Sequence, residues 1–478
     1  MTSLSHFADQ DTFYERDCAI GAGQMARVID AVERQIEQGM LIAGQRLPSI
    51  RAMAGVHSVS RDTVQRAYDR LVASGRIYAR RGSGFYVSAP PAAPPPSAPA
   101  AVPPDDRVAF QLIYASPPLD CAPGSGVLRH EASAIDELNR VVKSVAAFGM
   151  RANGYGELAG YRPLREHLRQ KFAIEGIDVP VDSIFTVPGC IAGIGIVVRA
   201  FVRPGRPVLI ENPSSYMHLN ALLSQGASIF YVPRLADGPD MHVLRELCER
   251  HRPVMFLLSS LIQNPTGSCI SLHKARQLIE IAAEFDMILV DDAAYADLLP
   301  PGNGRLSAPL MLLDHLDRVI HVGGTSRILT PDVGIGYIVA GDRYVDMLRR
   351  FRSSHLLGNL LLAERVFYRF LDEGLYRRRC ERVRANLAQS MVALQQHVTR
   401  LRLDVAPAVG GMFLWVDCGE GADTRGLSRQ MLNRGFLMAP GRHFCPPGVP
   451  SSKMRFNVTT SSTSALQAFA EVLSSASS

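Results

Sequence analysis

The feature that most limits the fold is a proline-rich stretch, SAPPAAPPPSAPAAVPP, which fills residues 88–104 with eight prolines in seventeen residues. Proline has no backbone N–H and a fixed φ, so such a stretch cannot build a core and should form an extended, semi-rigid spacer. The chain of 478 residues is also longer than one compact core normally holds. The sequence therefore predicts two folded parts, at 18–88 and 108–478, joined by a Pro/Ala-rich linker at 89–107.

The first part, called the head below, has the pattern of three helices and a hairpin. Apolar residues recur at helical spacing from Met25 to Ile36, and Gly39 should end that helix. A short second helix should begin near Pro48 or Ser49, and Ser60 is a good N-cap for a third helix that ends at Gly75. Two short strands, 76–79 and 85–87, flank a glycine-containing turn. This order is typical of a winged helix-turn-helix, an α+β domain.

Positive charge is concentrated in the head. Between Arg46 and Arg81 there are eight arginines and two acidic residues, a local net charge of +6 that equals the formal net charge of the whole chain. The remainder of the chain is therefore close to neutral. A short segment that holds all the excess positive charge indicates a polyanionic partner.

The run GQRLPSIRAMAGVHSVSRDTVQRAYDRLVASGRIYARRGSGFYV resembles the GntR-type DNA-binding domain, which reads LPS-x-R, then VSR-x-TV-x-x-AY-x-x-L, then a G-x-G wing. The resemblance implies that the third helix enters the major groove by its N-terminal turn, where arginine can contact a guanine edge or a phosphate with two hydrogen bonds. The candidate DNA contacts are Arg51, Ser60, Arg61, Thr63, Gln65, Arg81 and Gly82, with Arg66 and Arg80 as weaker candidates.

The second part, called the body, alternates apolar strands with helical patterns, which predicts an α/β fold with a largely parallel sheet. Ligands gather beyond the carboxyl ends of the strands in such sheets. The expected strands lie in 183–189, 207–213, 228–233, 253–259, 287–295 and 318–326.

From Pro118 to Val472 the sequence is similar to the class I aminotransferases of fold type I, which use pyridoxal phosphate (PLP). The segments that carry the similarity are NGYGELAGYRPLREHLRQ, PGCIAGI, ENPSSY, QNPTG, DDAAY and KMRFNVT. The resemblance implies a large sheet domain, a smaller C-terminal α+β subdomain and a set of ligand-binding residues. In that set the amides of Cys190 and Ile191 meet the phosphate, Tyr216 stacks on the ring, Asn264 and Tyr295 bond the phenolic oxygen, Asp292 pairs with the ring nitrogen, and Arg455 binds a carboxylate.

The sequence departs from the family where the family's G-T-x-S-K motif supplies the lysine of the Schiff base. Here the run reads GGTSRILTPDVGIGY: Ser326 is kept, Arg327 stands at the lysine position, and Gly334 stands where an arginine holds the phosphate. Arginine stays charged, so it neither condenses with an aldehyde nor acts as a base. Only four lysines remain, and of these Lys453 alone lies near the pocket by family topology. The sequence therefore predicts no catalytic residue and no transaminase turnover.

Three interpretations of the pocket stay open. In the first it holds PLP, pyridoxamine phosphate or a PLP–amino acid adduct without covalent attachment. In the second, Arg327 and Arg455 clamp another small anionic or amino-acid-like effector. In the third the body is a ligand-free dimerisation scaffold.

The order of head, linker and body resembles the MocR/GabR family of bacterial regulators. This resemblance implies a transcriptional regulator that binds double-stranded operator DNA as a domain-swapped homodimer and senses a small molecule. The polar N-terminus and the lack of a long apolar run predict a cytoplasmic location. The alternatives are a PLP-dependent aminotransferase that carries a DNA-binding domain, and a protein whose head no longer binds DNA. The polar N-terminus, the lack of an apolar run of about 18 residues and the scattered cysteines predict no signal peptide, no membrane partner and no metal site.

Overall fold

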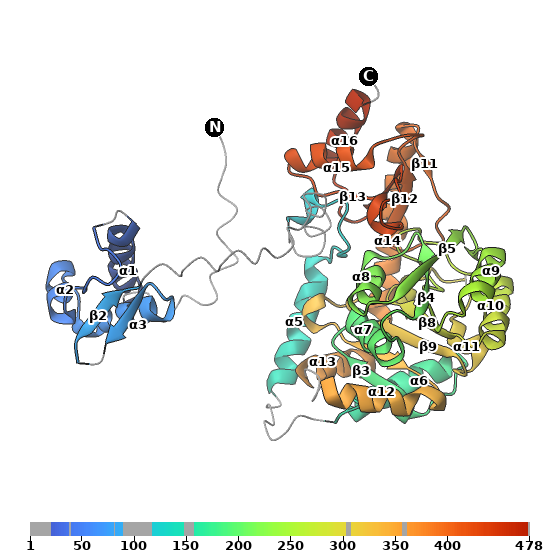
Figure 1. The fold of residues 1–478 in the computed structure, drawn as a ribbon, viewed down its shortest axis with the longest axis horizontal. Coiled ribbons are helices and arrows are strands. Elements are labelled where there is room, and N and C mark those ends of the chain that lie inside the picture. Colours follow the sequence, from blue (N-terminus) through green and yellow to red (C-terminus); the bar gives the residue numbers. More distant parts are fainter. Residues whose placement is uncertain are drawn as a thin grey trace. The chain divides into compact units, whose positions relative to one another are not determined.

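The computed structural model describes residues 21–37, 40–80, 82–88, 117–147, 157–302, 307–355 and 361–476. The chain divides into two compact units, residues 1–101 and 102–478 (Figure 1). The predicted linker, residues 89–107, lies outside the described residues, so its bounds and those of the two predicted domains stay predictions.

The head is a winged helix-turn-helix, as predicted. Its helices are α1 (Gly21–Glu37), α2 (Ile50–His57) and α3 (Arg61–Ala73), and its hairpin pairs β1 (Ile77–Arg80) with β2 (Gly84–Val87) in antiparallel register. Both strands begin one residue away from the predicted positions. The predicted stop of the first helix at Gly39 lies outside the described residues, which resume at 40.

The third helix forms where its sequence signals place it. Ser60 is the N-cap, and its Oγ accepts a hydrogen bond from the backbone N–H of Thr63 at 3.0 Å. Gly75 follows the helix with a φ of 72°, a left-handed conformation that glycine adopts without steric cost. The apolar face of α3 is buried, and the hydroxyl of Tyr68 on that face donates to the carbonyl of Pro48 at 3.0 Å. This bond fixes α3 against the start of α2.

The body contains an eight-stranded sheet in the order β3-β10-β9-β8-β7-β4-β5-β6. Its five central strands, from β9 to β5 in that order, run parallel, whereas β10 is antiparallel to both of its neighbours and β6 is antiparallel to β5. The strands are β3 (Ile184–Val187), β4 (Pro207–Asn212), β5 (Ser228–Leu235), β6 (Gly238–Pro239), β7 (Met255–Leu258), β8 (Ile288–Ala293), β9 (Val319–Gly324) and β10 (Gly336–Val339). All six predicted strands are confirmed.

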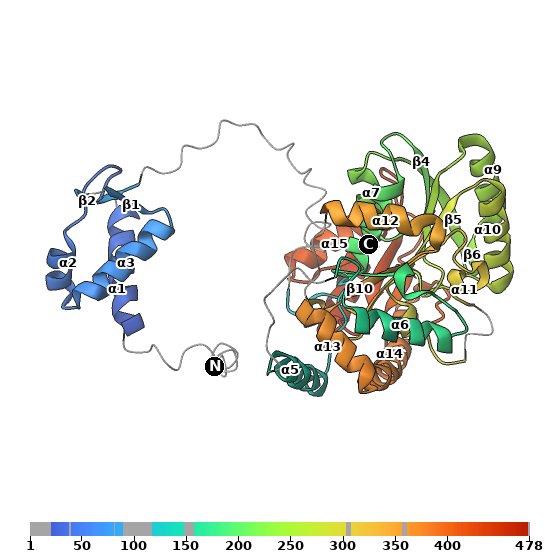
Figure 2. The same cartoon turned by 90° about the horizontal axis from the view of Figure 1, so that it is seen from below.

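Helices cover both faces of this sheet, and each face has its own apolar core (Figures 1 and 2). One core packs α7 (Cys190–Phe201), α8 (Tyr216–Ser224) and α12 (Asp342–His355) against the sheet. The other packs α5 (Ala132–Ala147), α6 (Arg162–Ile174), α9 (Met241–His251), α10 (Leu272–Glu284), α11 (Leu310–Asp314), α13 (Leu361–Asp372) and α14 (Leu375–Arg400). Short 3₁₀ turns lie at Leu119–Cys121, Val181–Ser183, Ala296–Leu298, Pro331–Val333 and Gly441–Phe444.

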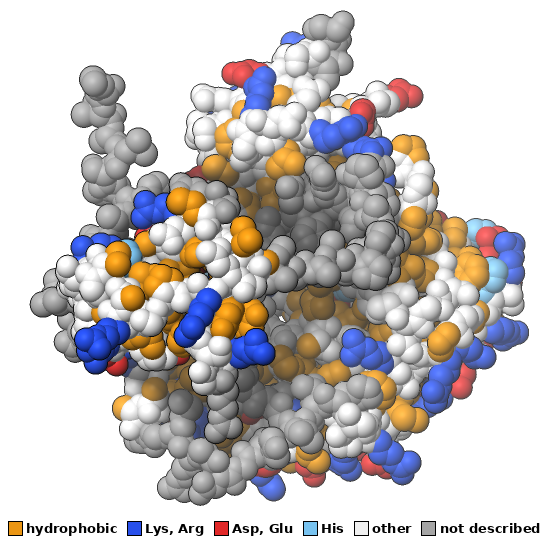
Figure 3. All heavy atoms as spheres, turned by 60° about the vertical axis from the view of Figure 1, so that its left-hand side comes forward, with side chains coloured by type: hydrophobic (Ala, Val, Ile, Leu, Met, Phe, Trp, Pro, Cys, Tyr) orange, Lys and Arg blue, Asp and Glu red, His pale blue; other side chains and the backbone are white. Residues whose placement is uncertain are grey.

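A smaller antiparallel sheet follows in the order β11-β12-β14-β13. Its strands are β11 (Asp404–Val405), β12 (Phe413–Asp417), β13 (Ala439–Pro440) and β14 (Lys453–Asn457), accompanied by α15 (Thr424–Asn433) and α16 (Thr463–Ala476). The fold-type-I architecture, with a large mixed sheet and a C-terminal α+β subdomain, is therefore confirmed. On the face shown in Figure 3, acidic and basic side chains are interspersed over the rim of the body.

Candidate functional site

The N-terminal turn of α3 presents polar side chains to solvent. Ser60 and Arg61 are exposed, and Thr63 is half-buried with its hydroxyl 2.8 Å from Ser60 Oγ. The free N–H groups and the positive end of the dipole make this turn a favourable place for a phosphate. Arg61 can therefore reach a nucleic acid, while Ser60 and Thr63 stabilise the turn that carries it.

The other predicted DNA contacts of the head are arranged around the same helices. Arg51 is exposed in the first turn of α2, and Gly82 has a φ of 74° with open space where a side chain would stand. Gln65 is held within α3, because its Nε2 donates to Asp69 Oδ1 at 2.8 Å. Arg66 and Arg80 are exposed, and Arg81 lies outside the described residues.

In the body, the centre of the predicted site is Asp292 near the carboxyl end of β8. Its Oδ2 accepts from His218 Nε2 at 2.5 Å, and its Oδ1 accepts from the backbone N–H of Ala294 at 3.0 Å and from Cys190 Sγ at 3.1 Å. Burial by itself raises the pKa of Asp292, but the hydrogen bond and the charge of His218 outweigh it, so the pKa lies below its usual value. The carboxylate is therefore ionised and can accept a hydrogen bond from a protonated ring nitrogen.

A second group joins Asn264 to Arg455 on β14. Arg455 is 1% exposed; its Nη1 donates to Asn264 Oδ1 at 2.8 Å and its Nη2 to the carbonyl of Gly124 at 2.6 Å. The guanidinium carbon lies 4.2 Å from the ring centre of Phe413 and 4.8 Å from that of Phe444. The Nε has no partner among the described contacts. The buried cation is thus positioned by two aromatic rings and keeps a free donor.

Arg327 lies beside Tyr295 in the same cluster. Its Nη2 donates to the hydroxyl of Tyr295 at 3.3 Å, and its guanidinium carbon is 5.2 Å from the ring centre of Tyr295. Burial raises the pKa of Tyr295, although Arg327 and Arg455 oppose the shift, so the phenol stays protonated. The Nε of Arg327 is buried without a partner among the described contacts. Tyr216 is half-buried and interacts electrostatically with both Tyr295 and Arg455.

The turn that carries Arg327 leaves no space for a side chain at Gly334. A Cβ there would lie 2.7 Å from Ser326 Cβ and 3.0 Å from the carbonyl oxygen of Thr330. The φ of −69° and ψ of 119° at Gly334 suit any residue, so the obstacle is purely steric. An arginine at this position would require the turn that carries Arg327 to move.

The predicted phosphate cradle lies at the start of α7. Gly189 precedes the helix with a φ of 89°, Cys190 is buried, and Ile191 is 38% exposed. Burial and the neighbouring Asp292 raise the pKa of the Cys190 thiol well above its usual value, so it stays protonated. The helix N-terminus is a suitable anion site in principle, but Gly334 adds no charge to it.

Three of the four lysines are paired with carboxylates. Lys143 is exposed on α5, and each of the others forms an ion pair: Lys171 with Glu175 at 2.8 Å, Lys274 with Asp237 at 2.6 Å, and Lys453 with Asp417 at 2.6 Å. Lys453, the one lysine expected near the pocket, is therefore paired with the carboxylate at the C-terminal end of β12.

The sequence did not identify several members of this cluster. His218 lies two residues after Tyr216 on α8, and its hydrogen bond with Asp292 joins residues that are 74 positions apart in the sequence. In the sequence alone, Phe413 and Phe444 cannot be distinguished from ordinary core residues. Gly124 contributes only its carbonyl, which no sequence pattern reveals.

These residues fit one half of PLP. The Asp292 carboxylate suits the ring nitrogen, and Tyr295 can donate to the phenolic oxygen. Asn264 can donate as well, because only its Oδ1 is engaged among the described contacts. The other half does not fit, since Arg327 cannot bond covalently to an aldehyde and the site of the phosphate arginine is sterically closed.

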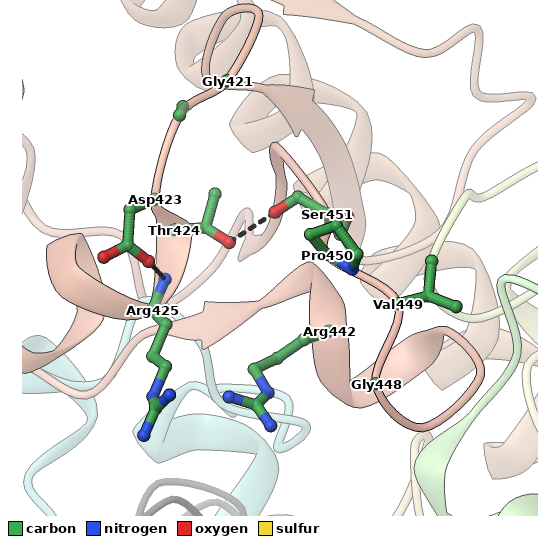
Figure 4. Close-up of a pocket in the computed structure, with 10 residues that line it drawn as sticks. Gly421, Asp423, Thr424, Arg425, Arg442, Gly448, Val449, Pro450 and Ser451 are labelled. Carbon is green, nitrogen blue, oxygen red and sulfur yellow. Dashed lines mark hydrogen bonds between the residues drawn. The ribbon is translucent and has the colours of Figure 1, made fainter.

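A separate cavity of about 460 Å³ lies in the C-terminal subdomain, at the start of α15 (Figure 4). Its wall includes Asp423, which accepts from the backbone N–H of Arg425 at 3.1 Å, and Thr424, whose hydroxyl donates to the carbonyl of Ser451 at 2.7 Å. The side chains of Arg425 and Arg442 extend in the same direction in Figure 4. None of the predicted ligand-binding residues lines this cavity.

Among the described residues, no three or more His, Cys, Asp and Glu side chains are grouped as metal ligands. None of the described helices combines the length and apolar character that crossing a bilayer requires.

Comparison with known proteins separates the two units in the same way. Residues 24–87 match the model of bacterial regulatory proteins of the gntR family, and residues 124–473 match the model of aminotransferase class I and II. The uncharacterized HTH-type transcriptional regulator YdcR of Escherichia coli is 28% identical over 443 residues, covering 90% of this chain and 94% of that protein. The probable rhizopine catabolism regulatory protein MocR of Rhizobium meliloti is 28% identical over 390 residues, covering 77% and 76%.

Aminotransferases are similar to a smaller share of the chain. The 2-aminoadipate transaminase of Thermus thermophilus is 30% identical over 311 residues, covering 64% of this chain and 77% of the enzyme. The crystal structure of Pyrococcus horikoshii kynurenine aminotransferase aligns with a TM-score of 0.69 at 23% identity, covering 77% of this chain and 94% of that one. The chain belongs to the aminotransferase class I and II family, with a gntR-family winged helix-turn-helix at its N-terminal end.

Proposed function

We propose that this protein is a DNA-binding transcriptional regulator of the MocR type, whose head reads duplex DNA and whose body binds a small molecule without transaminase turnover. The observation that carries the proposal is the turn at the start of α3, where a Ser60 cap holds an exposed arginine at a helix N-terminus. Regulators with this architecture among the relatives support it.

In the head, Arg61 and Arg51 are the proposed specific contacts, with Gly82 allowing the wing to approach the DNA backbone. Ser60 and Thr63 present Arg61, because their hydroxyls are bonded to each other and to the helix start. Gln65 is a weaker contact in this arrangement, since its amide is engaged by Asp69. Arg81 is kept as a proposed wing contact on sequence grounds.

In the body, the cluster around Asp292 is proposed to bind the effector. By the resemblance to the aminotransferases, Asn264, Tyr295, Tyr216 and Arg327 would surround a planar ring, and the buried cation of Arg455 would bind a carboxylate. If PLP is a ligand, it supplies an electron-withdrawing ring whose nitrogen Asp292 would pair with; its attachment here would be non-covalent. We also propose a cytoplasmic, domain-swapped homodimer.

The competing proposal is an aminotransferase that carries a DNA-binding domain, and the ionised Asp292 with its His218 partner favours it. Turnover also needs an amine that forms and exchanges the bond to the substrate. Arg327 stands at that position by sequence similarity, and three of the four lysines are engaged in ion pairs with carboxylates. The regulator without turnover is therefore the better proposal.

The test is selection of genomic fragments by the purified full chain, followed by anisotropy titrations of the selected duplex at fixed salt. Arg61→Ala should weaken binding by about 1–3 kcal/mol per half-site, or roughly 5- to 150-fold. Arg70→Ala is the matched control, since Arg70 is exposed near the C-terminal end of the same helix and its replacement removes the same charge. Equal losses in both variants, or no enriched duplex, would contradict sequence readout by this turn.

A further inference from the structure

The mismatch between this pocket and PLP suggests which ligand it does accept. We propose that the body binds a 3-hydroxypyridine that bears a carboxylate at ring position 4, in place of the aldehyde of PLP, and needs no phosphate at position 5. This inference rests on the proposed function and names the class of effector for its pocket.

The ring edge of such a ligand has partners that the structure already orients. Asp292 is ionised and 4% exposed, which suits a protonated ring nitrogen. Tyr295 stays protonated and can donate to the oxygen at ring position 3. Asn264 is turned by the bond from Arg455 to its Oδ1, so its amide nitrogen faces away from that arginine and can donate to the same oxygen.

The position of Arg327 specifies the next substituent around the ring. Its Nη2 lies 3.3 Å from the Tyr295 hydroxyl, so an oxygen bonded to Tyr295 has the guanidinium beside it. Positions 2 and 4 both flank position 3, and position 4 is the one that bears the aldehyde of PLP, to which the family's lysine, at the position of Arg327, is bonded. A carboxylate there can accept two parallel hydrogen bonds from a guanidinium, whereas an aldehyde offers one neutral acceptor. The partnerless Nε of Arg327 shows that the group has unused donor capacity.

The turn behind Arg327 indicates what position 5 requires. Gly334 supplies no cation, and the 2.7 Å approach of its Cβ position to Ser326 prevents a side chain from being added without moving the turn. The cation that the family devotes to the phosphate is thus absent, and a cation stands beside position 4. Because Arg327 and Arg455 together outnumber the one carboxylate of Asp292, the cluster also favours an anionic ligand.

The test is isothermal titration calorimetry on the full chain with three 3-hydroxypyridines. They are 4-pyridoxate, which has a carboxylate at position 4 and no phosphate, pyridoxal, which has the aldehyde and no phosphate, and PLP, which has both the aldehyde and the phosphate. Wild type should bind 4-pyridoxate at least tenfold more tightly than the two aldehydes. Arg327→Lys should lose at least tenfold in 4-pyridoxate affinity. The same variant should gain the mass of pyridoxal less one oxygen atom after borohydride treatment, because the lysine amine condenses with the aldehyde, releasing water, and borohydride adds two hydrogens to the resulting C=N bond.

Two further variants separate this result from general damage. Arg349→Lys, an exposed arginine on α12, should leave 4-pyridoxate binding unchanged. Asp292→Asn should weaken all three ring compounds, and the fluorescence of the single Trp415 reports whether each variant keeps a folded body.

Tighter binding of PLP than of 4-pyridoxate by wild type would overturn the inference, as would unchanged 4-pyridoxate affinity in a folded Arg327→Lys. If none of the three compounds binds while the selected duplex still does, the ligand assignment fails and the regulator proposal survives. If 4-pyridoxate binds but no duplex is selected, the regulator proposal fails instead.

Discussion

Replacing Gly334 with alanine should destabilise the body by about 1–2 kcal/mol, and the structure shows why. The backbone at Gly334 has a φ of −69° and a ψ of 119°, which alanine adopts freely, so no dihedral strain arises. At such a site the loss of unfolded-state freedom stabilises a protein by about 0.4–1 kcal/mol. Against this, a Cβ 2.7 Å from Ser326 Cβ and 3.0 Å from Ser326 Cα forces the turn to shift. Overpacking of this kind costs roughly 1–3 kcal/mol, which exceeds the gain.

The assay is thermal unfolding of the full chain followed by tryptophan fluorescence. Trp415 is the only tryptophan of the chain and is 3% exposed within the body, so its signal reports the body and not the head. A cost of 1–2 kcal/mol should lower the midpoint by a few degrees in a domain of this size. Gly195→Ala in α7 is the control, because nothing lies within 4 Å of its Cβ position and alanine favours a helix.

The steric explanation also predicts coupling between two positions. Ser326→Gly removes the Cβ that Gly334→Ala would approach, so the double variant should recover most of the loss. A Gly334→Ala variant as stable as Gly195→Ala, or a double variant whose losses simply add, would refute the reasoning about this turn.

Three further predictions follow from the same structure. Ser60→Ala should cost the head about 1 kcal/mol, seen as faster amide exchange in α3, whereas Ser74→Ala, beyond its other end, should not; equal exchange in both would argue against the cap. Burial, Arg379 and Arg327 lower the pKa of His130 from 6.5 to about 4. As the pH falls, the unfolded chain is therefore protonated before the folded one, and the stability of the body should fall by up to about 3 kcal/mol between pH 6.5 and pH 4. In thermal melts followed by Trp415 fluorescence, His130→Asn should reduce this pH dependence of stability, and an unchanged dependence would contradict the prediction. Glu211→Gln should destabilise the body by about 3–5 kcal/mol because it leaves the fully buried Arg234 unpaired; a loss below 1 kcal/mol in urea titrations would show that the pair is unimportant.

Local signals were sufficient for most of the fold. In the head, the Ser60 cap, the apolar spacing from Val64 to Leu71 and Gly75 define a helix without reference to anything distant. In the body, apolar runs that end in polar residues marked all six expected strands. Hydrophobic spacing and capping act over a few residues, and the sequence displays them directly. The antiparallel placement of β10 between β3 and β9 depends on distant pairings that the sequence pattern does not reveal.

The candidate site was predictable only in part, for a related reason. Asp292 and Arg455 belong to motifs whose spacing can be read along the chain. The contact of His218 with Asp292, and the Phe413 and Phe444 rings beside Arg455, join elements far apart in sequence. The closed space at Gly334 is likewise a property of the folded turn, since the sequence shows only a missing arginine.

If the protein is a regulator as proposed, a small molecule bound by the body must change the DNA affinity of the head. The most direct measurement is the dissociation constant of the full chain for its selected duplex, with and without a saturating pocket ligand found by calorimetry. Because coupling between sites is typically 1–3 kcal/mol, we expect a change of roughly fivefold or more in wild type and none in Asp292→Asn. The same dissociation constant in wild type with the pocket empty and saturated would contradict the claim.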